Sequence, residues 1–151
     1  MINERLQELG IELPVAFPPA GNYLACVVFD DIVHVGGHGP INGSQIIRGK
    51  VGRDLSLEED RKRPGRPACR SWQRCWRSSV TLTVSSESSK SSEWSTCPGF
   101  NQTPAVIDGC SNLVVDVFGD RGRHTRSAVG MAELPFDIAV EIELTAVIRP
   151  R

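Results

Sequence analysis

The chain has 151 residues, of which 40% are hydrophobic, and a formal net charge of -1 at pH 7. This length fits a single domain over residues 1–151 with a core of its own, and so small a net charge gives no general reason to expect binding to nucleic acid or to an anionic membrane. No apolar run approaches the ~20 residues that cross a bilayer, and the polar, charged N-terminus lacks the apolar stretch of a signal peptide.

The cysteines indicate a reducing environment. There are five, and no two are spaced as a CxxC pair. An odd number without such a pair favours neither a disulfide framework nor a zinc site. We therefore expect a cytoplasmic protein. The five cysteines are Cys26, Cys69, Cys75, Cys97 and Cys110.

The N-terminal part of the chain predicts a helix followed by a hairpin. Asn3 can cap a short helix over residues 3–9, which Gly10 ends. After a proline-rich connector, apolar residues favour strands over residues 22–29 and 32–35, with two aspartates as the turn between them.

A glycine-rich stretch, GGHGP over residues 36–40, follows the hairpin. Glycines on both sides of a histidine let the backbone approach another group closely. A third short strand is predicted over residues 46–51. A helix then begins near residues 54–59, where Ser56 and Glu59 have the spacing of a capping box.

Residues 60–96 do not continue this pattern. The first half is basic and contains prolines where the capped helix should run on, and the second half is rich in serine. Taken as written, such a segment is typical of a disordered or nucleic-acid-binding insert. The first long helix and the central strand of the domain would then be unable to form.

The genetic code favours another interpretation, a frame-shifted stretch. Read one base early, permitted codons for residues 82–96 encode LDRVERVVKVLGMVN, which has the apolar pattern of a helix, a turn and a buried strand. A serine-rich loop has no reason to conceal such a pattern. We therefore expect the native chain to differ from the given sequence between the neighbourhoods of Asp60 and Thr96, through two compensating single-base changes.

The sequence beyond this segment is regular again. Thr103 is predicted to cap a helix with Pro104 at its first position, and apolar residues recur at helical spacing until Gly119. The apolar positions are Val106, Ile107, Cys110, Leu113, Val114, Val117 and Phe118. The order of elements predicts an α+β sheet with helices on one face.

Two strands and a turn are predicted over residues 124–146. The turn falls at residues 134–137, where Leu-Pro-Phe-Asp breaks the pattern. In the second strand, apolar residues alternate with Glu141, Glu143 and Thr145, which predicts one buried and one polar face.

Arg126 is the unusual residue of the first of these strands. It shares a face with the small residues Ala128, Gly130 and Ala132, which leaves an open slot with a fork of donors at one end. A guanidinium fork matches a carboxylate bidentately. The alternative is an edge-strand arginine paired with a glutamate on the next strand, and spacing alone does not decide between the two.

This segment resembles the signature of the Rid family of imine deaminases, also called the YjgF family. The signature runs from an arginine and a small residue, through Leu-Pro, to an apolar-Glu-apolar-Glu stretch. The matching residues are Arg126-Ser127-Ala128-Val129, Ala132, Leu134-Pro135 and Val140-Glu141-Ile142-Glu143. The resemblance covers the N-terminal two fifths and the C-terminal third of the chain, and the N-terminal extension is typical of a less characterised branch.

The resemblance implies a mixed or antiparallel sheet with two helices on one face, assembled as a homotrimer with sites between subunits. It implies that Arg126 grips the substrate carboxylate, with help from the backbone N–H near Ala128. Glu141 would position or activate the hydrolytic water, Tyr23 would close the pocket, and Gly37 would lie beside the ligand.

Four positions depart from the residues usual in the family. Gly36 stands where deaminases often carry serine, and Gly109 where they carry asparagine. His124 replaces the usual proline or alanine two residues before the arginine. His38 stands in place of glutamine, and a histidine among glycines is a candidate substrate contact and proton carrier near neutral pH.

The function that the resemblance implies is hydrolysis of small reactive 2-imino acids to 2-oxo acids and ammonia, which needs no metal and no cofactor. The alternative is a non-catalytic protein that binds a small carboxylate and acts as a sensor or chaperone-like partner. A ribonuclease, an activity ascribed to some relatives, is disfavoured by the near-neutral charge and by the lack of a basic, aromatic-lined surface outside residues 60–96.

Overall fold

A computed structural model describes residues 2–11, 19, 21–42, 45–56, 90–96 and 99–148. Its elements in chain order are α1 (Ile2–Glu8), β1 (Cys26–Phe29), β2 (Ile32–His38), β3 (Ile41–Asn42), β4 (Gln45–Ile46), β5 (Lys90–Thr96), α4 (Thr103–Phe118), the 3-10 turn η1 (Gly119–Gly122), β6 (Thr125–Met131), the 3-10 turn η2 (Pro135–Asp137) and β7 (Val140–Val147).

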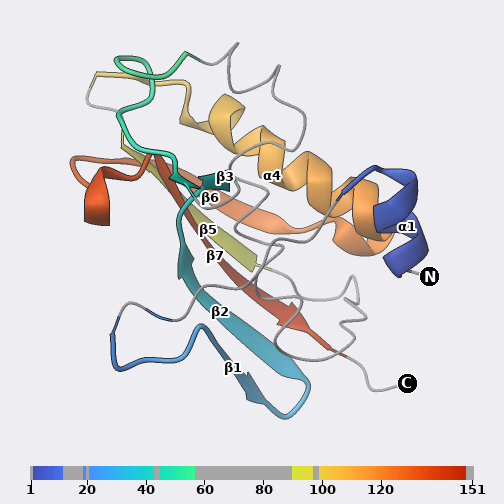
Figure 1. Cartoon of the computed structure of the whole chain (residues 1–151). Coiled ribbons are helices and arrows are strands. Elements are labelled where there is room, and N and C mark those ends of the chain that lie inside the picture. The colour runs from blue at the N-terminus through green and yellow to red at the C-terminus, as the bar shows by residue number, and fades with distance from the viewer. Residues whose placement is uncertain are drawn as a thin grey trace.

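Five strands form one mixed sheet in the order β1-β2-β7-β5-β6, and β3 pairs with β4 separately. Neighbouring strands of the large sheet are antiparallel except for β5 and β6, which are parallel. Helix α4 lies across one face of the sheet, and α1 packs beside the end of α4, where Arg5 Nε donates to the carbonyl of Asp116 at 2.9 Å (Figure 1). The predicted α+β class with helices on one face is confirmed.

The core lies between β7 and α4. Every second residue of β7 is buried, and the residues between them are half-buried, as the alternation in the sequence predicted. Burying a large aliphatic side chain contributes roughly 1.5–3 kcal/mol, so this seam fixes which face of the sheet meets the helix. The buried residues of the seam are Val140, Ile142, Leu144 and Ala146 from β7 and Val106, Ile107, Cys110 and Val114 from α4.

The N-terminal elements differ from prediction mainly at their boundaries. The first helix, predicted over residues 3–9 with Asn3 as its cap, runs over Ile2–Glu8, so Asn3 lies inside the helix instead of capping it, and Gly10 follows with a φ of +63°. The strand predicted over residues 22–29 begins only at Cys26. Conversely, β2 continues through the glycines to His38, with an irregular register after Val35, because pairing with β7 holds these residues extended.

The third strand predicted over residues 46–51 is wrong in extent. Only Gln45–Ile46 is a strand, and beyond it are isolated bridges. Gly49 and Gly52 have φ values of +108° and +84°, which turn the chain where a strand would continue straight. The carboxylate of Asp54 accepts the Lys50 N–H at 2.8 Å and closes the turn.

The start of α4 also corrects a prediction. Thr103 is the first helical residue rather than the cap, which is Gln102, and the Thr103 hydroxyl donates to the carbonyl of Ala128 at 3.3 Å. The threonine therefore ties the helix to β6 instead of capping it. The predicted end at Gly119 is confirmed, with a φ of +63°.

The irregular middle segment is described only in part. The predicted capping box with Glu59, and residues 57–89 in general, lie outside the described residues. Lys90–Thr96, however, is β5 and pairs with both β7 and β6. The expectation that the residues as written cannot form this strand is therefore wrong.

A buried lysine joins the turn that contains Gly49 and Gly52 to the connection between β6 and β7. Lys50 is 8% exposed, and its ammonium donates to the carbonyl of Ala132 at 2.9 Å and lies 2.7 Å from Glu133. The connection itself turns through Phe136 and Asp137, both with positive φ, as the Leu-Pro-Phe-Asp sequence predicted. Among the described helices, none is long and apolar enough to cross a membrane.

Candidate functional site

Arg126 lies on the edge strand β6 and points to helix α4. Its Nη2 is 2.7 Å from Asp108 Oδ1 and donates to the carbonyl of Pro104 at 3.4 Å, and its Nη1 donates to Ser111 Oγ at 2.9 Å. The side chain is 25% exposed. Three groups on one stripe of α4 thus hold the guanidinium, as the i, i+4, i+7 spacing of these residues allows.

The carboxylate beside Arg126 bears on the alternative of an edge-strand arginine paired with a glutamate on the next strand. A glutamate from the neighbouring strand is not the partner; an aspartate from the helix is. Ala128, two residues along β6, is on the same face and packs against the core formed with α4.

A chain of hydrogen bonds extends from Arg126 to His124. The Nδ1 atom of His124 is 2.7 Å from the carbonyl of Gly122, and because a carbonyl can only accept, Nδ1 carries the proton. In the neutral ring, Nε2 then accepts from the Ser111 hydroxyl, 3.2 Å away. This direction turns a lone pair of Ser111 towards Arg126, so His124 fixes the orientation of the serine.

Glu141 belongs to a different environment. It is half-buried on β7 beside Gly37 of β2, where an added Cβ would lie 1.9 Å from Glu141 Oε1. Only glycine therefore leaves room for this carboxylate. Burial raises the pKa of the Glu141 carboxyl above its ordinary value of 4.5, and the neighbouring charge of Glu143 raises it further.

The two environments lie on opposite faces of the sheet. Through β5, Arg126 stands in register with Leu144, and Glu141 stands in register with Val129. Residues directly opposite each other in a ladder share a face. Leu144 belongs to a buried cluster against which Phe118 of α4 packs, so Arg126 faces the helix and Glu141 faces away from it.

Tyr23 and His38 are not brought to Arg126 either. Tyr23 is 57% exposed in the bend before β1. Strands β1 and β6 are opposite edges of the sheet, which at ~4.8 Å per strand separates them by ~19 Å. His38 is half-buried at the end of β2, where its Nδ1 is bonded to the carbonyl of Gly36.

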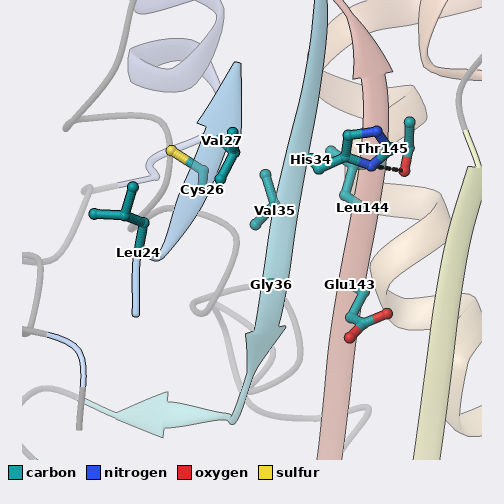
Figure 2. Close-up of a pocket in the computed structure, with 9 residues that line it drawn as sticks. All are labelled: Leu24, Cys26, Val27, His34, Val35, Gly36, Glu143, Leu144 and Thr145. Atoms are coloured by element: carbon teal, nitrogen blue, oxygen red, sulfur yellow. Dashed lines mark hydrogen bonds between the residues drawn. The ribbon is translucent and has the colours of Figure 1, made fainter. Parts of the chain in front are cut away.

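A groove of about 400 Å³ opens beside β1, β2 and β7 (Figure 2). In it, Thr145 Oγ1 is hydrogen-bonded to His34 Nδ1 at 2.9 Å. Because Gly36 and Glu143 line it, the groove lies near Gly37 and Glu141 and not near Arg126. The groove is lined by Leu24, Cys26, Val27, His34, Val35, Gly36, Glu143, Leu144 and Thr145.

The sequence analysis missed Asp108 and Ser111, and treated Gly109 as the relevant position of this helix. The available signal was a polar i, i+3 pair at the border of an apolar stripe, which places both side chains on one face. Within the described ranges, no group of three or more His, Cys, Asp or Glu residues is placed to hold a metal. The described residues offer one partly buried guanidinium, that of Arg126, and one carboxyl with a raised pKa, that of Glu141.

No protein-family model matches the chain. Protein TCP17 of Trypanosoma cruzi is 34% identical over 141 residues, which cover 91% of this chain and 88% of that protein. Atu1372 of Agrobacterium tumefaciens, a crystal structure of unknown function, is 33% identical with a TM-score of 0.78 and covers 98% of this chain and 92% of its own.

The solved structures define the class as small α+β proteins of one fold. A Shewanella oneidensis protein described as a candidate endoribonuclease superposes with a TM-score of 0.85 at 21% identity, covering 98% of this chain and 99% of its own. The YjgF gene product and TdcF with bound serine, both from E. coli, superpose with TM-scores of 0.52 and 0.56 at 18% and 20% identity and cover about nine tenths of both chains. The chain therefore has the fold of the YjgF gene product.

Proposed function

We propose that this protein hydrolyses small, reactive 2-imino acids to 2-oxo acids and ammonia. The observation that carries the proposal is that Nη2 of Arg126 already holds a carboxylate, that of Asp108, at 2.7 Å. The guanidinium is largely buried and oriented by helix α4, so a substrate carboxylate meets donors that need no reorganisation. No cofactor is required for this reaction.

Glu141 is the acid–base group of the proposal. A carboxyl with a raised pKa is a better base towards water than an ordinary one, and in its neutral form it can return a proton to the departing nitrogen. Gly37 supports this role, because its missing side chain leaves space against the Glu141 carboxylate. His38, two residues from the groove-lining Gly36, is proposed to contact the substrate from the same side, and Tyr23 to close the pocket.

A complete site requires a second copy of the chain in this proposal. Arg126 and Glu141 face opposite sides of one sheet, so a single ligand cannot touch both in one subunit. The face turned away from α4 also exposes apolar residues, which a neighbouring subunit would cover: Val27 at 53%, Phe29 at 72%, Val129 at 43% and Met131 at 40% exposure. We therefore propose a homotrimer with sites between subunits, as the family resemblance implies.

A second candidate is a non-catalytic protein that binds a small carboxylate. TdcF, which has this fold, was solved with serine bound, and the Arg126 environment would hold such a ligand without any reaction. Ribonuclease activity, suggested by the description of the Shewanella relative, has no support from the net charge of -1. Assays of imine turnover, carboxylate binding and RNA cleavage distinguish the deaminase, the binding protein and the ribonuclease.

The test is release of 2-oxo acid from an imine generated in situ by an amino-acid oxidase, followed against a blank without the protein. Acceleration that Arg126→Ala and Glu141→Gln both remove supports the deaminase. Carboxylate binding that depends on Arg126 without acceleration favours the binding protein. If the protein shows neither acceleration nor carboxylate binding, the proposed site is wrong. Cleavage of a folded RNA would favour the ribonuclease.

A further inference from the structure

Asp108 is the acidic residue of the Arg126 environment. Its carboxylate is half exposed, lies 2.7 Å from Arg126 Nη2, and comes from the second turn of α4. The effect of this acid on an incoming ligand rests on the proposed role of Arg126 as a carboxylate anchor. It does not depend on catalysis.

A ligand carboxylate that reaches Arg126 must lie close to Asp108. A guanidinium has five N–H donors, and the described contacts to Asp108, Ser111 and Pro104 use only Nη1 and Nη2. Donors therefore remain for a second carboxylate while Asp108 keeps its place. Two carboxylates on one guanidinium leave an excess negative charge, and the like charges disfavour each other.

A cationic nitrogen on the ligand removes this penalty. In a 2-imino acid the protonated nitrogen is attached to the carbon next to the carboxylate. When that carboxylate shares the Arg126 guanidinium with Asp108, the nitrogen therefore lies near Asp108. The charges then alternate: Asp108, Arg126, ligand carboxylate, ligand nitrogen. A 2-oxo acid has the same carboxylate but no cation to place beside Asp108.

We propose that Asp108 is a specificity-determining residue that favours carboxylates with an adjacent cationic nitrogen over carboxylates without one. Hydrolysis converts the first kind into the second: an iminium acid and water give a 2-oxo acid and an ammonium ion, with the nitrogen leaving together with the positive charge. Asp108 therefore admits the substrate and repels the product, which speeds product release from the same arginine.

The experiment compares two probes with the same three-carbon skeleton, alanine as the zwitterion and pyruvate as the 2-oxo acid. Dissociation constants are measured by ligand-observed NMR for the wild type, Asp108→Asn, Asp108→Glu and a control, Asp120→Asn. Asp120 suits the control because it forms an exposed ion pair with Arg123 at 3.1 Å, outside the network.

Asp108→Asn is expected to tighten pyruvate and weaken alanine, changing the ratio of their affinities by about tenfold, equivalent to ~1.4 kcal/mol. Asp108→Glu keeps the charge and should keep the wild-type preference in sign. Asp120→Asn should leave the ratio unchanged. Thermal unfolding of each variant checks that the fold is retained.

An affinity ratio that Asp108→Asn leaves unchanged, while Arg126→Ala still abolishes binding, would overturn the role of Asp108 and leave the proposed function intact. If the wild type and Asp108→Asn bind neither probe, Arg126 is not a carboxylate anchor and both ideas fall. If the preference changes as expected but no imine is hydrolysed, the inference stands and the deaminase proposal is overturned.

Discussion

Arg126 and Glu141 project from opposite faces of the same sheet, two strands apart, with β5 between their strands. Their strands are separated by ~10 Å before the thickness of the sheet is added. The family resemblance assigns both to one site, and the geometry of one chain keeps them apart. The two facts agree only if different subunits supply the two residues.

Subunit complementation tests this arrangement directly. Arg126→Ala and Glu141→Gln should each be inactive alone, but co-expressed chains should form mixed assemblies that regain activity. If each site takes one residue from each of two neighbours, about one quarter of the sites in a random equal mixture are intact. A co-expressed pair with no activity above the single variants would show that the two residues act within one chain or not together.

The strength of the Arg126 anchor is measurable through substitution. Charge-assisted hydrogen bonds are worth roughly 1.5–3 kcal/mol each, so loss of a bidentate contact in Arg126→Ala should weaken carboxylate binding at least ~100-fold. Arg126→Lys should recover little, since an ammonium lacks the fork. Titration of pyruvate, with Arg123→Ala as an exposed control, checks both values, and equal affinity in the lysine variant would contradict bidentate binding.

Glu141 should make stability depend on pH in a defined direction. Its pKa in the folded protein is raised from 4.5, so below that value the carboxyl is protonated in both folded and unfolded chains. As the pH rises through the raised pKa, the folded chain bears the cost of a half-buried charge. Glu141→Gln should therefore match wild-type stability near pH 4 and exceed it at pH 7, in urea unfolding at both values.

The same substitution should lower turnover more than substrate binding, because a group that positions water acts mainly in the transition state. Asp120→Asn, which removes a carboxylate from an exposed ion pair with Arg123, is the control. The kinetic comparison uses kcat and KM for the imine generated in situ. A rise in KM at unchanged kcat would assign Glu141 to ligand binding instead.

The spacing of apolar residues in the sequence predicted those elements of the fold that bury one face in the core. The alternation in β7 and the apolar stripe of α4 could be read directly, because each has one face in the core. The extension of β2 to His38 could not, since pairing with β7 overrides the turn preference of glycine. The contact of Asp108 with Arg126 spans 18 residues, and no periodicity reports which strand a helix faces.

Lys50 gives a prediction about the fold rather than the site. Lys50 is 8% exposed, and its ammonium bonds to the Ala132 carbonyl and the Glu133 carboxylate. Lys50→Met keeps the volume but leaves the Ala132 carbonyl without this donor, and an unsatisfied group of this kind costs about 1–3 kcal/mol. The free energy of unfolding in urea should fall by that amount, whereas Lys50→Arg should lose less. An unchanged midpoint would show that water replaces the ammonium.

The segment over residues 60–96 carries the last prediction. In the ladder, position 93 stands in register between Ile142 and Ala128, and position 95 between Val140 and Gly130. Ile142 is 2% exposed, so these rows belong to the core face. The chain places the fully buried Ser95 in a row where apolar residues are the rule, and its hydroxyl donates to the Ala139 carbonyl at 3.5 Å.

The reading frame one base earlier gives the seven positions of β5 as KVLGMVN, with valine at 91 and 95 and glycine at 93. A buried valine in place of Ser95 should add ~2 kcal/mol. A chain with the alternative residues over 60–96 should therefore unfold at distinctly higher urea concentration than the chain as written. Peptide mapping of protein from its native source should recover the alternative peptides. Recovery of peptides containing Trp72, Trp76 and Trp94 from folded, active protein would show that the sequence as written is the native one.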